Sequence, residues 1–235
     1  MRDKQRAKQS VALNEIGETK IMDIKRIAIL AAAVLALSPA ARAQNWEFGG
    51  GAGGSFYPSN TVTNGSASAS LGAQTNIAAG LWLANNINDK WGGEVRIDYA
   101  RGDLKLSNSA TQTTFNSEAY ALHYDFQYHF SHATARIRPY VAAGGGVKYY
   151  RGIGSQVLFQ PLSQFVLLTQ GTQLEPMISV GGGLKFKITE HLGFRLEVHD
   201  YITPVPKDII TPNIGSKISG WMQDITPMAG ISYLF

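Results

Sequence analysis

The sequence predicts an all-β protein, an eight-stranded antiparallel up-and-down transmembrane β-barrel. Three observations favour this fold: apolar and polar residues alternate along most of the chain, long and short connections follow each other in turn, and aromatic residues gather near the ends of the predicted strands. The chain has 235 residues, no cysteine and 16% charged residues, which suits one domain without disulfides or cysteine-ligated metal. No run of 18 apolar residues is present, so no helical membrane span is expected.

Residues 22–43 have the features of a secretion signal. Lys25 and Arg26 form a positive segment ahead of an apolar run at 27–37, which Pro39 ends. A run of this length is too short for a permanent helical anchor but suits the apolar core of a signal peptide. We therefore predict that this segment directs export.

The predicted cleavage site follows directly. Ala41 and Ala43 place small side chains at the two positions that a signal peptidase recognises, so we predict cleavage before Gln44. Residues 1–21 are polar and unpatterned, and we expect Met22 to be the true start and 1–21 an over-extended gene prediction.

The basic charge of the chain belongs to this leader. The whole chain has 21 Lys and Arg against 17 Asp and Glu. Residues 1–43 contain eight of the basic and four of the acidic residues, which leaves 13 of each for 44–235. Because the predicted mature domain is neutral, we expect no nucleic-acid partner.

The strand prediction rests on alternation with a period of two. In Tyr120–Phe130, aromatic and aliphatic residues occupy every second position, and Ala, His, Asp and Gln occupy the others. A strand places each set on one face, whereas a helix would scatter both around its surface. After residue 44 we find no helical periodicity. The same alternation, stronger or weaker, predicts seven further strands at Trp46–Phe56, Gly72–Leu83, Gly93–Tyr99, Arg136–Tyr150, Ile178–Ile188, Phe194–Tyr201 and Trp221–Phe235.

The connections between these strands alternate in length. Long polar loops are predicted at 57–71, 102–113, 151–175 and 202–219, and short turns at 84–90, 131–135 and 190–192. Transmembrane barrels sort their connections in this way, with short turns in the periplasm and long loops outside the cell. An even number of strands would place both termini on the periplasmic side.

One long loop contains unexpectedly apolar residues. Val157–Phe159 and Phe165–Leu168 lie within the predicted loop 151–175. Three interpretations stay open: the flanking strands extend as a hairpin, the loop packs over the mouth of the barrel, or an extra pair of strands raises the total to ten.

The apolar face of the strands decides between a membrane barrel and a soluble one. A soluble ligand-binding barrel keeps this face inside, whereas a membrane barrel turns it toward lipid. Aromatic residues lie toward the strand ends of this face, as in the girdles at the two membrane interfaces. These residues are Trp46, Phe56, Trp91, Tyr99, Tyr120, Phe130, Trp221, Tyr233 and Phe235.

The opposite face is predicted to line a narrow lumen. Six acidic and six basic residues, with two histidines beside them, form this predicted polar network: Glu47, Glu94, Arg96, Asp98, His123, Asp125, Arg138, Lys148, Lys185, Lys187, Arg195, Glu197, His199 and Asp224. An isolated charge in a medium of low dielectric constant costs many kcal/mol, so we expect these charges to pair across strands and to plug the lumen. The alternative is a narrow polar pore, in which Lys148, Lys185 and Lys187 would give a weak anion preference.

No catalytic residue, metal site or cofactor is predicted. Gly49–Gly54 matches the dinucleotide pattern G-x-G-x-x-G, but it lies within a predicted strand and no helix follows, so we assign it to bending or close backbone approach. His123 and His129 lie about 20 Å apart along one strand, too far to share a metal ion. His199 and Asp200 are the one suggestive pair for a hydrolase, but adjacent strand residues point to opposite faces, so these two cannot orient one another directly.

The last residues resemble the carboxy-terminal signal of bacterial outer-membrane barrels, with Ile231, Tyr233 and a terminal Phe235. The resemblance implies recognition by the barrel-assembly machinery of a Gram-negative cell. Residues 46–54, 138–147 and 193–198 are also similar to small barrels of the OmpA-type transmembrane superfamily, and the likeness covers 44–235.

This resemblance implies insertion in outer-membrane lipid. The peptidoglycan-binding domain that OmpA-type proteins carry after the barrel is not expected here, because the chain stops at Phe235. The implied role is structural or surface-interacting, with an extracellular ligand possible at the four long loops. A small-solute channel is the alternative.

Overall fold

The computed structural model describes residues 46–74, 76–155 and 159–235. The predicted signal peptide, its cleavage residues Ala41 and Ala43, and residues 1–21 lie outside the described residues. Within the described ranges all regular secondary structure is β-strand, and no helix there is long and apolar enough to cross a membrane.

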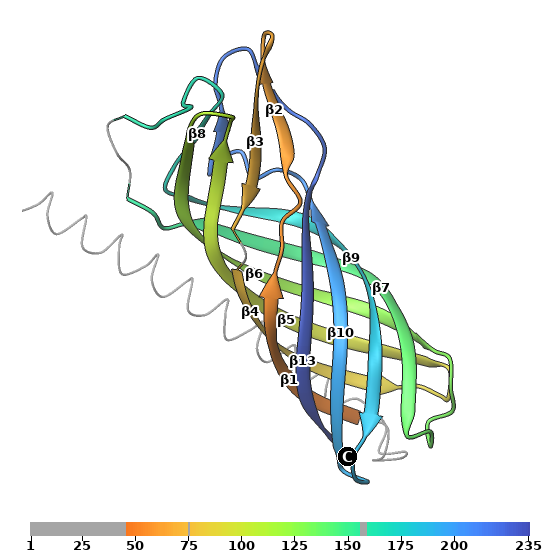
Figure 1. Cartoon of the computed structure of the whole chain (residues 1–235). Helices are drawn as coiled ribbons and strands as arrows, with labels where there is room; N and C mark the ends of the chain where they lie inside the picture. Colours follow the sequence, from red (N-terminus) through yellow and green to blue (C-terminus); the bar gives the residue numbers. More distant parts are fainter. Residues whose placement is uncertain (1–45, 75, 156–158) are drawn as a thin grey trace, which may run out of the picture. The chain divides into compact units, whose positions relative to one another are not determined.

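Eight antiparallel strands form a closed ring. They are β1 (Trp46–Ser55), β4 (Asn76–Asn86), β5 (Trp91–Ser107), β6 (Gln112–His129), β7 (Ile137–Gly152), β9 (Gly171–Lys187), β10 (Leu192–Thr203) and β13 (Met222–Leu234). Each strand pairs with the strands before and after it in this order, and β1 pairs with both β4 and β13. The amide of Phe235 donates to the carbonyl of Trp46 at 2.9 Å, where the last strand meets the first. The predicted eight-stranded fold is confirmed (Figure 1), and the ring does not contain ten strands.

The second ring strand begins later than predicted. We expected a strand at Gly72–Leu83, whereas the ring strand is Asn76–Asn86. Residues Ala67–Ala73 instead form β3, which pairs with β2 (Asn60–Asn64) and with the far end of β5. Gly65 lies in the tight turn of this hairpin with φ of +58°, a conformation that glycine adopts without steric cost. The predicted loop 57–71 is therefore largely a hairpin.

The other long connections are also shorter or more ordered than predicted. β5 and β6 remain paired up to Ser107 and Gln112, so most of the predicted loop 102–113 is strand. The two remaining long loops supply β8 (Val166–Leu168), β11 (Ile210–Pro212) and β12 (Ser216–Ile218). β8 pairs with β11, and β12 pairs with β2, all outside the ring. Alternation along a single strand could not reveal these pairings, because the segments are short and their partners are distant.

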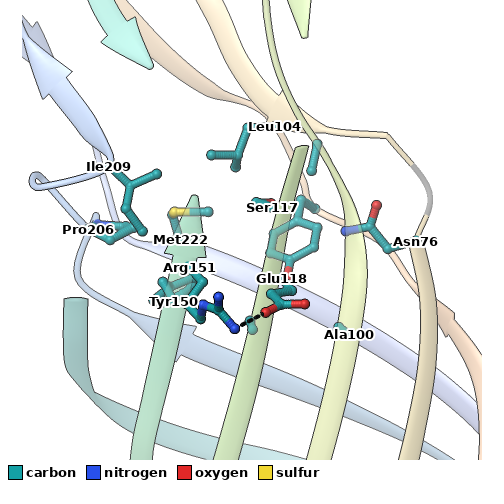
Figure 2. Close-up of a pocket in the computed structure, with 13 residues that line it drawn as sticks. Asn76, Ala100, Leu104, Ser117, Glu118, Tyr150, Arg151, Pro206, Ile209 and Met222 are labelled. Carbon is teal, nitrogen blue, oxygen red and sulfur yellow. Dashed lines mark hydrogen bonds and ion pairs between the residues drawn. The ribbon is translucent and has the colours of Figure 1, made fainter. Parts of the chain in front are cut away.

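These segments cover the long-loop end of the ring and bury a hydrophobic core there. We name the segments together with this core the cap. Its buried members are Val62, Ala69, Leu71, Leu104, Leu106, Phe115, Ala119, Tyr150, Leu162, Phe165, Val166, Leu168, Val205, Ile209, Ile210 and Met222. Figure 2 shows part of the cap, where Ile209 and Met222 lie near Leu104 and Tyr150. Of the three interpretations of the apolar loop, packing against the end of the barrel is the one observed for Phe165–Leu168.

The wall of the ring has an apolar outer face and a polar inner face. Ile97 and Leu122 are 54% and 49% exposed, whereas their neighbours in sequence, Arg96 and His123, are 0% and 3% exposed. A soluble barrel has the reverse arrangement. Most of the aromatic residues predicted for the outer face are exposed there, including Trp91, Phe130 and Trp221.

The ring also encloses aromatic residues, which the sequence analysis placed only outside. Trp82 is 2% exposed and points inward from β4. It fits because β1 has Gly49 opposite: a Cβ atom there would lie 2.5 Å from the indole ring, and one on Gly230 would also collide with it. The glycine run of β1 therefore provides space inside the lumen for a large side chain.

We predict that Gly49→Ala destabilises the barrel by about 1–3 kcal/mol, because the new methyl group overpacks against the buried Trp82. Gly50→Ala is the matched control: its methyl group would face the outside, 2.9 Å from the end of the exposed Leu81 side chain and 3.3 Å from the backbone oxygen of Gly80. Because the exposed side chain can turn away, a change within about 0.5 kcal/mol is expected. Urea unfolding of the barrel refolded in detergent measures both. Equal midpoints for the two variants would contradict this explanation of the glycine run.

Candidate functional site

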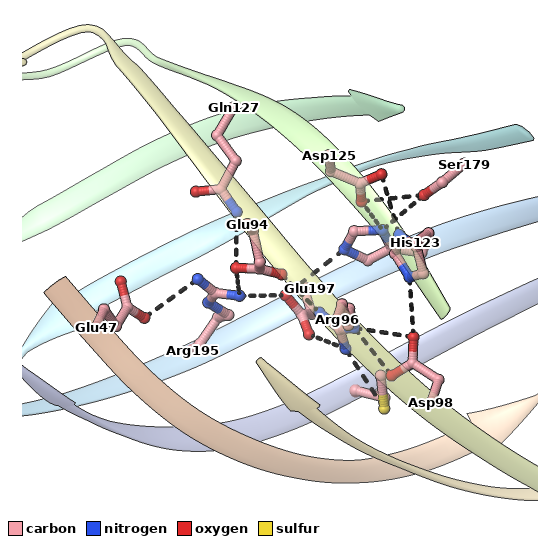
Figure 3. Close-up of polar contacts among 12 residues, drawn as sticks. Glu47, Glu94, Arg96, Asp98, His123, Asp125, Gln127, Ser179, Arg195 and Glu197 are labelled. Atoms are coloured by element: carbon pink, nitrogen blue, oxygen red, sulfur yellow. Dashed lines mark hydrogen bonds and ion pairs between the residues drawn. The ribbon is translucent and has the colours of Figure 1, made fainter. Parts of the chain in front are cut away.

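The inward side chains of β5 and β10 build the centre of the lumen. Arg96 of β5 contacts Glu94 at 3.3 Å and Asp98 at 2.9 Å on its own strand, and Glu197 of β10 at 2.6 Å. All four side chains are nearly inaccessible to solvent. Because residues two apart share one face of a strand, the alternating sequence of β5 alone places a cation between two carboxylates. Figure 3 shows this cluster.

Arg195 of β10 forms a second centre beside the first. It contacts Glu94 at 2.7 Å, Glu47 of β1 at 3.1 Å and Glu197 at 3.2 Å. Glu47 also pairs with Lys185 of β9 at 2.9 Å. Each carboxylate therefore serves two cations, and the pairs join into one network.

The indole ring of Trp82 lies against both arginines of this network. The Arg195 and Arg96 guanidinium carbons lie 4.6 and 5.1 Å from the centre of the ring. The face of an indole ring attracts a cation, and the attraction is stronger when water is excluded. Trp82 therefore fills the lumen and also stabilises the buried positive charges.

A histidine branch extends the network toward the long-loop end. His123 lies 3.2 Å from Asp98 and 3.1 Å from Asp125, and His199 lies 3.5 Å from Asp125. The hydroxyl of Tyr201 donates to Asp98 at 2.6 Å. The branch connects the inner faces of β5, β6 and β10.

A separate pair lies nearer the cap. Lys148 of β7 contacts Asp224 of β13 at 2.5 Å, and both are buried. Asp224 also accepts hydrogen bonds from Ser55 and Thr226. The charges of this pair are satisfied beneath the apolar cap.

Arg138 lies at the short-turn end without a carboxylate contact within the described chain. Its guanidinium donates to Asn86 Oδ1 at 2.7 Å and to the backbone carbonyl of Asp89 at 2.9 Å. In register it lies opposite Lys185. A partly open vestibule here is lined in part by Arg138, Lys185, Lys187 and Glu47.

Lys187 differs from the other residues of the predicted network. It is exposed at the end of β9 and has no ion pair among the described residues. Its position in the alternation is correct, but the strand ends there, so the ring no longer covers its side chain. The remaining members are buried or, for Lys185, nearly so.

The exposed turns at this end are joined by a polar contact of their own. His132 Nδ1 lies 3.0 Å from Asp89 Oδ2, and the amide of Ala133 donates to the other carboxyl oxygen at 3.2 Å. These hydrogen bonds lower the pKa of the Asp89 carboxyl, because they favour its charged form.

The sequence analysis missed several neutral members of the network. Gln127 donates to Glu94 and accepts from Lys185, at 2.9 and 3.0 Å, and the Tyr140 hydroxyl donates to Glu197 at 2.6 Å. Both positions share the parity of the charged residues on their strands. That shared parity was the available signal, but charge on the side chain was the feature that defined the predicted network, and Gln127 and Tyr140 are neutral.

One group resembles a catalytic triad in composition. Ser179 lies 3.1 Å from Asp125 and 3.5 Å from His199 Nδ1. However, its hydroxyl donates to the carboxylate instead of the imidazole, and all three residues are sealed inside the lumen. The geometry does not give the serine an activating base. Within the described ranges, no group of His, Asp and Glu side chains is arranged to hold a metal ion.

We predict that Arg195→Ala or Glu197→Ala lowers the free energy of unfolding by about 3–5 kcal/mol, because each change leaves buried charges without a partner. Lys187→Ala removes an exposed cation and is expected to change stability by less than about 0.5 kcal/mol. Denaturant unfolding of the refolded barrel gives the three values. The network has no energetic importance if all three variants unfold at the midpoint of the wild type.

Comparison with known proteins agrees with this architecture. The family model described as "outer membrane protein beta-barrel domain" matches residues 27–213. Among solved structures, Neisserial surface protein A is similar at 10% identity and a TM-score of 0.52, over 81% of this chain and 97% of that one. OprG from Pseudomonas aeruginosa is similar at 14% identity and a TM-score of 0.52, over 82% and 97%.

These two likenesses show the fold alone. No curated protein sequence matches the chain significantly. The family match covers most of the chain, and the lipid-facing barrel described above agrees with it. The chain therefore belongs to the outer-membrane β-barrel protein family and is located in the outer membrane.

Proposed function

We propose that this protein is a non-enzymatic outer-membrane barrel with a plugged lumen, whose folded cap presents a surface to the outside of the cell. One observation carries the proposal. Arg195 of β10 pairs with Glu94 of β5, and Arg96 of β5 pairs with Glu197 of β10.

These two strands lie on opposite sides of the ring. The ring order is β1, β4, β5, β6, β7, β9, β10, β13, so β5 and β10 are four places apart. Ion pairs between them must cross the lumen. A second crossing joins Tyr201 of β10 to Asp98 of β5. Between this layer and the cap, a cavity beside Asp98 and Lys148 leaves room for roughly one water molecule.

The cap supports a role in surface interaction. Ordered loops on a rigid scaffold are the usual place for recognition, and here β2, β3 and β12 form one small sheet that continues from the end of β5. We propose that an extracellular ligand or partner binds this part of the protein.

A narrow channel is the second candidate, and the periplasmic vestibule favours it. Arg138, Lys185 and Lys187 give this vestibule a cationic wall, offset by Glu47. If the crossing ion pairs opened, anions would be concentrated at the periplasmic mouth.

Conductance in a planar bilayer distinguishes the two candidates. We expect the refolded barrel, residues 44–235, to be silent, because the crossing pairs occlude the lumen. A heat-dependent gel shift on the same sample shows that the barrel is folded. Long-lived ionic current steps whose size changes when Lys185 and Lys187 are neutralised would show that the channel, and not the plugged barrel, is the correct proposal.

We also propose that the barrel-assembly machinery recognises Ile231, Tyr233 and Phe235. All three side chains point outward from the last strand and are about half exposed, so a second protein could contact them during insertion.

Deleting Phe235 is therefore expected to reduce assembly in cells but to spare refolding in detergent. Phe235→Ala retains the backbone bond to Trp46 and should show the same assembly defect. Phe130→Ala, which removes another exposed aromatic ring at the short-turn end, is the control. Folded barrel in cells is measured by its heat-dependent gel shift. Wild-type amounts of folded barrel in cells with either Phe235 variant would refute recognition of the terminal residue.

A further inference from the structure

The outer face of β5, β6 and β7 is divided into rows by the strand register. Tyr99, Tyr120 and Tyr149 lie side by side in one row. Ile97, Leu122 and Val147 form the next row toward the periplasm. This order, aliphatic and then aromatic, places the tyrosine row at the outer boundary of the hydrocarbon layer.

The next row outward is charged. It consists of Arg101 on β5, Glu118 on β6 and Arg151 on β7, paired in register. Two arginines therefore flank one glutamate directly above the tyrosines, at the depth of the lipid headgroups. The row has a net positive charge.

The cations on the lipid-facing wall are confined to this sector. Among the described outward-facing residues of the eight ring strands, the lysines and arginines are Arg101, Lys105 and Arg151. All three lie toward the extracellular ends of β5 and β7. The outward faces of β1, β4, β6, β9, β10 and β13 carry none. Two acidic residues, Asp103 and Glu118, share this sector, so the cations form a patch of net charge +1 on one side and not a belt around the barrel.

The glutamate fixes one arginine without neutralising both. Arg151 contacts Glu118 at 2.7 Å, and the hydroxyl of Tyr99 lies 3.3 Å from the other carboxyl oxygen (Figure 2 shows the Glu118–Arg151 pair). The side chain of Glu118 is only 11% exposed, whereas that of Arg151 is 46% exposed. Arg101 is also exposed. Each guanidinium therefore keeps donors that face the membrane surface.

We propose that Arg101 and Arg151 bind the phosphate of an anionic lipid headgroup in the outer leaflet. β5 and β7 are two strand spacings apart, about 10 Å, which two arginine side chains can bridge from either side of one phosphate. The planar guanidinium donates two parallel hydrogen bonds to phosphate oxygens. The tyrosines of the row below contact the upper part of the acyl chains, and the arginine stems lie along the same surface.

Lipid retention by the refolded barrel tests this site. The barrel in a neutral detergent is titrated with phosphatidic acid or with phosphatidylcholine of the same chain length, and bound lipids are counted by native mass spectrometry. We expect wild-type protein to retain phosphatidic acid preferentially. The double variant Arg101→Gln/Arg151→Gln should bind it about tenfold or more weakly, since each basic residue at a membrane surface contributes several-fold to binding.

The matched control is Lys90→Gln/Arg136→Gln. It removes the same charge from two cations beside the short periplasmic turns, outside the vestibule lining, and should leave phosphatidic acid binding within about twofold of wild type. Arg101→Lys/Arg151→Lys keeps the charge but removes the planar fork, so an intermediate affinity is expected. The gel shift verifies that each variant is folded.

Three results would overturn the proposal. They are no preference of the wild type for phosphatidic acid, an equal loss of affinity in the two Gln double variants, and full displacement of phosphatidic acid by inorganic phosphate at equal concentration. The last would identify a site for soluble anions instead of a lipid site.

Discussion

The structure depends on charge pairs that cross the lumen of the barrel. Arg96–Glu197 and Arg195–Glu94 join strands on opposite sides of the ring, so they fix the diameter and the relative height of the strands together. A shift of the strand register by one residue would point these charged side chains toward lipid, where each would cost several kcal/mol. The same pairs that specify the register also fill the interior, so the plugged lumen that we propose would be a consequence of how the barrel is held together.

Space for this network comes from glycine. The inward positions Gly49 of β1 and Gly230 of β13 have no side chains, and the indole ring of Trp82 occupies the space beside them, with the two arginines against it. An eight-stranded ring is only just wide enough for its own side chains. Large charged and aromatic groups can therefore meet at its centre only where the wall is thin. Removing that space and removing a charge would damage the same interior.

The two ends of the barrel have different chemistry. At the outer end the loops exclude water from an apolar cap, beneath which Lys148 and Asp224 are paired. At the periplasmic end the vestibule is open and Arg138 is held by an amide and backbone carbonyls instead of a carboxylate. Recognition outside the cell and lipid binding on the β5–β7 wall would therefore use surfaces that are separate from the lumen.

The sequence by itself determined the strand type, the lipid-facing side and the identity of most lumen charges, because alternation fixes the face of each residue locally. Only the tertiary structure decided which charges meet. Glu94 and Arg195 are 101 residues apart, and their contact depends on ring order and stagger. The inward position of Trp82 depends on the glycines of β1 and β13, and the hairpin of β2 and β3 depends on pairing with the end of β5. Neither feature can therefore be predicted from its own segment of sequence. Lys187 keeps the alternation but lies where the ring ends, and a periodic pattern cannot show where its covering partners stop.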